Sequence, residues 1–148
     1  MLLTPLTHPE ILRALGRAGH GSLVLIADAN FPASTARGPN AELVYLNLAP
    51  GMVLAASVLG AVLSATPVEA AIVMAPMTDG SWPLDREPPI WSDFRATLAQ
   101  HGSPLELQAV ERNAFYALAR TPDLALTIVS GEQQLYGNLV LRIGVRTS

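Results

Sequence analysis

Residues 18–32 constrain the fold of this chain more than any other stretch, because they hold an uninterrupted apolar run between turn-forming residues. The run Leu23–Ala27 predicts a buried strand. His20, flanked by two glycines that free the backbone around it, precedes the strand, and Asp28 follows it. A straight strand rises about 3.3 Å per residue, so His20 and Asp28 would lie roughly 26 Å apart. The two side chains therefore serve one site only if the chain folds back or if another copy supplies one of them.

Helical and strand-like segments alternate along most of the chain. The patterns predict helices over residues 8–18, 52–65, 90–101 and 111–120, and strands over residues 23–27, 43–48, 70–75, 105–110, 124–129 and 139–145. This alternation indicates α/β layers around a mainly parallel sheet, with the closing pair of strands able to run antiparallel. A length of 148 residues fits one domain, residues 1–148.

Three segments do not fit a simple alternation of buried strands and surface helices. The predicted helix 52–65 has no charged residue, which is typical of a helix buried on all sides and suggests cover by a neighbouring subunit. The loop 30–40 is longer than most connections, so we expect it at a functional site or an interface. Residues 76–90 hold four prolines, an Asp-Gly pair and Trp82, and predict an ordered irregular loop.

Composition excludes several classes of chemistry. The chain has no cysteine, which removes thiol catalysis, thiolate zinc sites and disulfides. All nine basic residues are arginine, so Schiff-base chemistry has no lysine amine. A net charge of -3 with only 14% charged residues provides no basic surface for nucleic acid. No His, Asp or Glu cluster has metal-ligand spacing, so we expect no metal.

The longest apolar stretch, residues 51–75, is interrupted by Pro67 and Glu69. About 16 residues precede this break, fewer than the roughly 20 that a membrane span requires. The N-terminal residues lack the basic and then apolar order of a signal peptide. We therefore expect a soluble, cytoplasmic protein.

His20 and Asp28 are the first candidates for a site. An imidazole titrates near neutrality and suits proton transfer, whereas the alternative is a core histidine bonded to backbone. Asp28 can accept hydrogen bonds from a polyol or orient an imidazole, or it can cap the turn at Asn30. Ligands of open α/β sheets gather outside the carboxyl ends of the strands, where Asp28 is expected.

Further candidates lie in the second half of the chain. Arg112 and Tyr116 share one helix face at i, i+4, either in a site or as a surface pair. The segment Tyr136-Gly137-Asn138 is either part of a site or a turn before the last strand. Glu132 can hold a sugar hydroxyl, and an ion pair with an arginine is the favoured alternative. Trp82 and Trp91 can stack on a sugar ring or serve in packing. Together these residues are compatible with a small polar pocket for a sugar.

Several of these stretches, in this order and spacing, resemble the fucose mutarotase and ribose pyranase family, the RbsD/FucU proteins. The matching segments span nearly the whole chain: Gly19-His20-Gly21, Ala27–Ala33, Arg112–Tyr116, Ser130-Gly131-Glu132, Tyr136-Gly137-Asn138 and Gly144-Val145. The Phe115-Tyr116 pair and the glycine of Tyr136-Gly137-Asn138 look more like the fucose mutarotases of this family than its ribose pyranases.

The resemblance implies a three-layer α/β/α fold with an open, mixed sheet, in a cytoplasmic, cofactor-free isomerase of carbohydrate metabolism. It implies a homodecamer of two pentameric rings, with the sugar pocket at a subunit boundary. By its motifs, His20 would be the catalytic acid/base, with Tyr136 or Tyr116 as its partner in proton transfer. Asp28, Arg112, Tyr116 and the segment Tyr136-Gly137-Asn138 would bind the sugar.

The expected activity is exchange between the α and β anomers of L-fucose or a related sugar. Two alternatives stay open: a D-ribose pyranase, and a sugar-binding ring without catalytic activity. Family members commonly carry an acidic residue two positions after the histidine, where this chain has Ser22. The loop 76–90 also has no clear counterpart in the family, which leaves the identity of the sugar open.

Overall fold

The computed structural model describes residues 2–147 as an α/β fold. Four helices and six strands follow one another along the chain: α1 (Pro9–Arg17), β1 (Leu23–Ala27), β2 (Glu42–Tyr45), α2 (Ala55–Leu63), β3 (Val68–Met74), α3 (Ile90–Gln100), β4 (Leu107–Val110), α4 (Arg112–Arg120), β5 (Leu124–Val129) and β6 (Leu139–Ile143).

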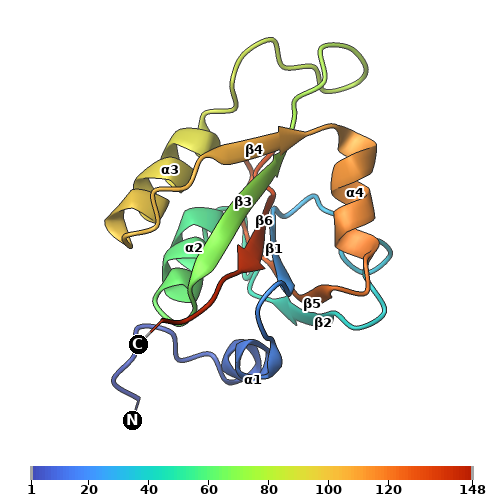
Figure 1. The fold of residues 1–148 in the computed structure, drawn as a ribbon. Helices are drawn as coiled ribbons and strands as arrows, with labels where there is room; N and C mark the ends of the chain where they lie inside the picture. The colour runs from blue at the N-terminus through green and yellow to red at the C-terminus, as the bar shows by residue number, and fades with distance from the viewer. Residues whose placement is uncertain (1, 148) are drawn as a thin grey trace.

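The strands form one open, mixed sheet in the order β2-β5-β1-β6-β3-β4 (Figure 1). β1, β2 and β5 run parallel to one another, and β3 runs parallel to β4. β6 lies between β1 and β3 and is antiparallel to both. The prediction of a mainly parallel sheet is therefore confirmed, but β5 and β6 do not pair, because β1 separates them.

Both faces of the sheet are covered, which gives three layers. One face packs against α1, α2 and α3 through alternate strand residues such as Val24, Ile26 and Ile128. The other face, which carries Leu23, Leu25 and Ala27, packs against α4 and the loop 30–40. β1 is buried throughout because side chains on both of its faces contact a core. This is why its sequence is a continuous apolar run rather than an alternating one.

Most predicted elements lie within a few residues of the observed ones. The strands 23–27 and 124–129 have the predicted bounds. The apolar helix predicted over residues 52–65 is shorter, since residues 49–53 form a turn that packs on Gly131. It also buries only one face within this chain, through Ala55, Val58, Leu59 and Val62.

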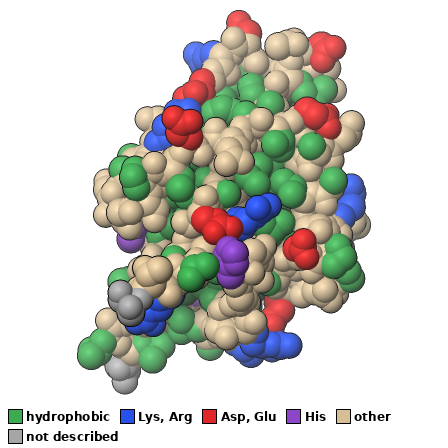
Figure 2. Space-filling model, viewed as in Figure 1, with side chains coloured by type: hydrophobic (Ala, Val, Ile, Leu, Met, Phe, Trp, Pro, Cys, Tyr) green, Lys and Arg blue, Asp and Glu red, His purple; other side chains and the backbone are tan. Residues whose placement is uncertain are grey.

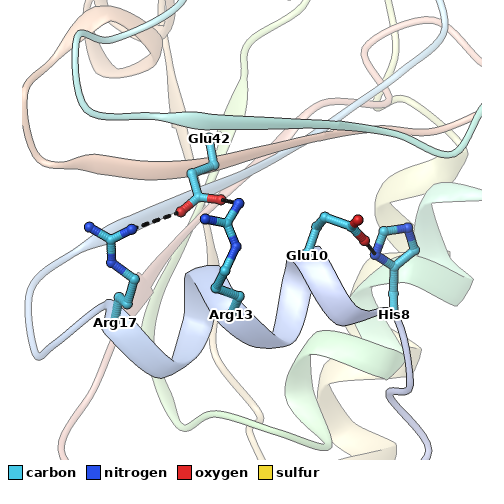
Figure 3. Close-up of polar contacts among 5 residues, drawn as sticks. All are labelled: His8, Glu10, Arg13, Arg17 and Glu42. Atoms are coloured by element: carbon cyan, nitrogen blue, oxygen red, sulfur yellow. Dashed lines mark hydrogen bonds and ion pairs between the residues drawn. The ribbon is translucent and has the colours of Figure 1, made fainter.

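Charged side chains attach α1 to the sheet edge. Glu42 on β2 accepts a hydrogen bond from Arg13 at 2.6 Å and lies 3.6 Å from Arg17, while His8 and Glu10 pair at 3.2 Å at the start of the helix (Figure 3). Elsewhere on the face seen in Figure 1, charges of both signs are spread among hydrophobic and neutral side chains (Figure 2).

Among residues 2–147, no helix has the length and apolar character needed to cross a membrane.

Candidate active site

A pocket of about 510 Å³ opens at one end of the strands, where β1, β3 and β5 end and β6 begins. Asp28 follows β1, Met74 ends β3, Arg112 follows β4 and Asn138 precedes β6. β6 is antiparallel, so the residue before it reaches the same edge as the residues that follow the parallel strands. The sheet order thus gathers side chains from distant parts of the sequence at one place.

Asp28 and Asn138 form a reciprocal pair at the floor of this pocket. The Asn138 amide nitrogen donates to Asp28 Oδ2 at 2.7 Å, and the Asp28 backbone amide donates to Asn138 Oδ1 at 2.9 Å. The Asn30 amide donates to Asp28 Oδ1 at 3.0 Å, so Asp28 both caps this turn and lines the pocket. Burial raises the pKa of Asp28 above its ordinary value, and these hydrogen bonds oppose the rise. The nearby Glu132 carboxylate adds to the rise.

Arg112 and Tyr116 come from the first turns of α4 and line the wall of the pocket. Glu111 begins this helix by accepting a hydrogen bond from the Ala114 amide at 2.7 Å. The Tyr116 ring stacks on Phe31, with centroids 5.4 Å apart, and the guanidinium carbons of Arg112 and Arg120 lie 5.4 and 5.3 Å from its centroid. The loop 30–40, expected at a site or an interface, therefore supplies part of this wall.

Tyr136 holds the loop between β3 and α3, which projects from the same edge of the sheet (Figure 1). Its hydroxyl accepts a hydrogen bond from the Met77 amide at 2.9 Å and donates one to the Trp82 carbonyl at 3.0 Å. Tyr136 has a positive φ of 61°, a left-handed backbone conformation that is uncommon for residues other than glycine. Its ring is buried and lines the pocket.

Gly137 does not line the pocket but is required by its surroundings. A Cβ at this position would lie 3.0 Å from both the Gln134 carbonyl oxygen and the Glu132 side chain. The favoured ion pair of Glu132 with an arginine is wrong. Its carboxylate instead accepts hydrogen bonds from the backbone amides of Gln133 and Gln134, each at 3.0 Å. Glu132 thus orders the turn that presents Tyr136 and Asn138.

His20 lies outside this pocket, at the opposite end of the strands. It is an exposed residue before β1, so the reading as a buried core histidine is wrong. Its Nε2 lies 3.0 Å from Glu69 Oε2 near the start of β3. β6 lies between β1 and β3. His20, before β1, and Glu69, at the start of β3, therefore meet near the end of β6, although they are 49 positions apart in sequence.

Sequence reasoning missed Glu69 and several lining residues. Glu69 gave no local signal, because its partnership with His20 depends on the position of β6. Met74, Gln133 and Leu135 line the pocket without any residue type that marks a site. Of the two tryptophans, Trp91 is buried in the core, and Trp82 lines the pocket while 71% exposed. Within residues 2–147, no three His, Asp or Glu side chains gather as metal ligands would.

Solved structures share this architecture. The fucose mutarotase of Streptococcus pneumoniae in complex with L-fucose superposes with a TM-score of 0.79, at 23% identity and with 97% of each chain covered. Bacillus subtilis RbsD complexed with D-ribose superposes with a TM-score of 0.74, at 22% identity, covering 99% of this chain and all of the other. At these identities the two structures establish a common fold.

Sequence comparison reaches further. The human fucose mutarotase is 33% identical over 146 residues, which cover 95% of this chain and 90% of the relative. The model of the RbsD / FucU transport protein family matches residues 1–146. Since both matches run through the pocket residues at each end of the chain, the chain belongs to the RbsD/FucU family.

Proposed function

We propose that the protein is a sugar mutarotase, an isomerase that interconverts the α and β anomers of L-fucose or a related monosaccharide without a cofactor. The observation that carries this proposal is the gathering of Asp28, Asn138 and Arg112 in one pocket whose remaining walls are largely apolar. A pocket with buried hydrogen-bonding groups discriminates strongly against ligands that lack the matching hydroxyls. The human relative is named a fucose mutarotase, which makes L-fucose the first sugar to test.

The reaction requires only proton transfers. A base removes the proton of the anomeric hydroxyl while an acid protonates the ring oxygen, and the bond between C1 and the ring oxygen breaks. The aldehyde rotates about its bond to C2, and the ring closes on its other face as both protons return. Positioned acid/base groups supply about 10²–10⁴-fold acceleration, which suffices for a reaction that already proceeds in water.

In this proposal His20 of one copy completes the pocket of another. His20 and the pocket lie at opposite ends of β1, so a single chain does not bring them together. An assembly of rings, with five or ten copies, places one end of a protomer against the other end of its neighbour. The residues of α2 that stay half exposed, such as Ala61 and Leu63, are available for contacts between copies.

Glu69 takes the place of the acidic residue that relatives carry two positions after the histidine. A carboxylate bonded to one imidazole nitrogen fixes the orientation of the ring. In this chain the residue at that position is Ser22, and the Glu69 carboxylate meets His20 Nε2 instead. Ser22 is therefore compatible with an active enzyme.

Tyr116 is the better partner of His20 in proton transfer. A phenol has one proton, and that of Tyr136 is donated to the Trp82 carbonyl. We therefore assign Tyr136 a positioning role, in place of the transfer role expected from sequence. Tyr116 lies in the same wall as Arg112, whose guanidinium can hold the oxygen that becomes negative.

NMR saturation transfer between the anomers tests the function directly. With L-fucose, the protein should accelerate α/β exchange, and D-ribose measured in parallel separates a mutarotase from a pyranase. His20→Ala should abolish the acceleration without changing the size of the assembly. Unchanged exchange in His20→Ala would remove His20 from the mechanism, and no acceleration with either sugar would favour a binding role.

Mixed assemblies test whether two copies share a site. His20→Ala and Asp28→Asn chains should each be inactive alone. After they are unfolded together and refolded as mixed rings, about a quarter of the sites would pair an intact His20 with an intact Asp28. Recovery of activity near that fraction supports a shared site, whereas no recovery would refute a site shared between two copies.

A further inference from the structure

In the single chain, Trp82 is a large apolar side chain that is exposed beside the pocket. It is 71% exposed, whereas Trp91 is only 7% exposed and lies within the core. Exposure of an indole forfeits the free energy that its burial would provide, unless a ligand covers it. Trp82 lines the pocket from the loop between β3 and α3.

The backbone of Trp82 is held in place although its side chain is exposed. The Tyr136 hydroxyl bonds the Trp82 carbonyl and the Met77 amide, and the Leu84 amide donates to the Met77 carbonyl at 2.8 Å. The segment from Met77 to Leu84 is therefore closed on itself and fastened to the buried ring of Tyr136. A side chain on a fixed segment contributes to binding with less loss of conformational entropy than one on a free loop.

The pocket is divided into polar and apolar parts. Asp28 and Asn138 present oxygen and nitrogen atoms at its floor, while Trp82 and Leu135 contribute large apolar side chains that are partly exposed. A pyranose ring has the same division, because its hydroxyls lie at its edges and one face presents C–H groups. A 6-deoxyhexose adds a methyl group to this apolar surface.

We propose that the indole of Trp82 is the apolar wall against which the C–H face and methyl group of a 6-deoxyhexose pack, so that it selects such sugars over their hydroxymethyl counterparts. The substrate class rests on the proposed function, since it presumes that the pocket holds a monosaccharide. Trp82 acts on binding alone and takes no part in proton transfer.

Intrinsic fluorescence tests the contact without any measurement of turnover. L-Fucose added to the wild-type protein should shift the emission of the exposed indole toward shorter wavelength and saturate. In Trp82→Phe only the buried Trp91 reports, so the shift should disappear while the sugar still binds by calorimetry. A shift that persists in Trp82→Phe would show that another part of the molecule reports the sugar, and would overturn the proposal.

Anomer exchange tests selectivity. Trp82→Ala should raise the half-saturating concentration of L-fucose about tenfold and leave the maximal rate within about twofold, because the lost contact is present throughout the reaction. With L-galactose, which carries a hydroxymethyl group in place of the methyl, Trp82→Ala should raise the half-saturating concentration by a smaller factor. Trp82→Phe should retain most of the affinity. Arg86→Ala, an exposed change on the same loop outside the pocket lining, is the matched control.

The outcomes separate this inference from the proposed function. A saturable fluorescence shift without accelerated exchange would retain the Trp82 site and refute the isomerase. Accelerated exchange with unchanged half-saturation in Trp82→Ala would retain the isomerase and refute the Trp82 site. Equal effects on both sugars, or a changed assembly size of Trp82→Ala by sedimentation, would also overturn the inference, since the indole would then serve another contact.

Discussion

Gly131 lies where two backbone segments approach each other more closely than a side chain allows. A Cβ at this position would lie 1.9 Å from the Met52 carbonyl oxygen, whereas ordinary van der Waals contact begins near 3.4 Å. The same residue donates its amide to the Val53 carbonyl at 2.7 Å and accepts from the Gly51 amide at 2.8 Å. Gly131→Ala therefore requires the two segments to separate by roughly 1.5 Å, which breaks both hydrogen bonds.

The expected cost follows from these contacts. Two lost backbone hydrogen bonds contribute about 1 kcal/mol each, and strain from forced packing adds about 1–3 kcal/mol. Gly131→Ala should therefore lower the free energy of unfolding by about 3–5 kcal/mol, a large fraction of the total for most domains. It should also lower activity, since Ser130 and Glu132 bond the backbone of Ala27 and Ala29 on either side of Asp28.

Urea unfolding followed by circular dichroism measures this change, at one protomer concentration because assembly affects apparent stability. Gly16→Ala is the control, since Gly16 is exposed in α1 and a Cβ there has nothing within 4 Å. The control should gain about 0.5–1 kcal/mol from helix propensity. A loss below about 1 kcal/mol for Gly131→Ala would refute the close contact between Gly131 and Met52.

Three further predictions concern the pocket and its surroundings. Burial raises the pKa of Asp28, so the ionised form is costly in the folded state at neutral pH, and this cost disappears as pH falls through the raised pKa toward 3.8. The stability of Asp28→Asn relative to wild type should therefore be greatest near pH 7 and decline on acidification, and a constant difference in unfolding experiments would contradict this account. Glu69→Gln should lower the maximal exchange rate about tenfold with an unchanged half-saturating concentration, because it removes the charge that orients His20. An unaltered rate would show that the His20–Glu69 pair is only a surface contact without a role in the reaction. Tyr136→Phe should destabilise the loop by about 1–3 kcal/mol and speed tryptic cleavage after Arg86, whereas Tyr45→Phe at the exposed sheet edge should not.

Local patterns determined most elements of this protein and marked several of its pocket residues as candidates, and the family resemblance supplied their roles. The run Leu23–Ala27 is a strand because an uninterrupted apolar segment of that length needs burial on both faces. Asp28 was a candidate because ligands of α/β sheets gather at the carboxyl ends of the strands, and Arg112 was one because it shares a helix face with Tyr116. Such patterns involve residues that are near one another in sequence, so they can be recognised without the tertiary structure.

Tertiary structure decided which of these residues meet. The insertion of β6 between β1 and β3 brings Asn138 to Asp28 at one edge and His20 to Glu69 at the other, and no local pattern specifies which strands become neighbours. The position of the Trp82 backbone likewise depends on a hydrogen bond from the hydroxyl of Tyr136, which is distant in sequence. Strand order is set by the packing of both sheet faces at once, so pairings between distant residues appear only when the whole core is assembled.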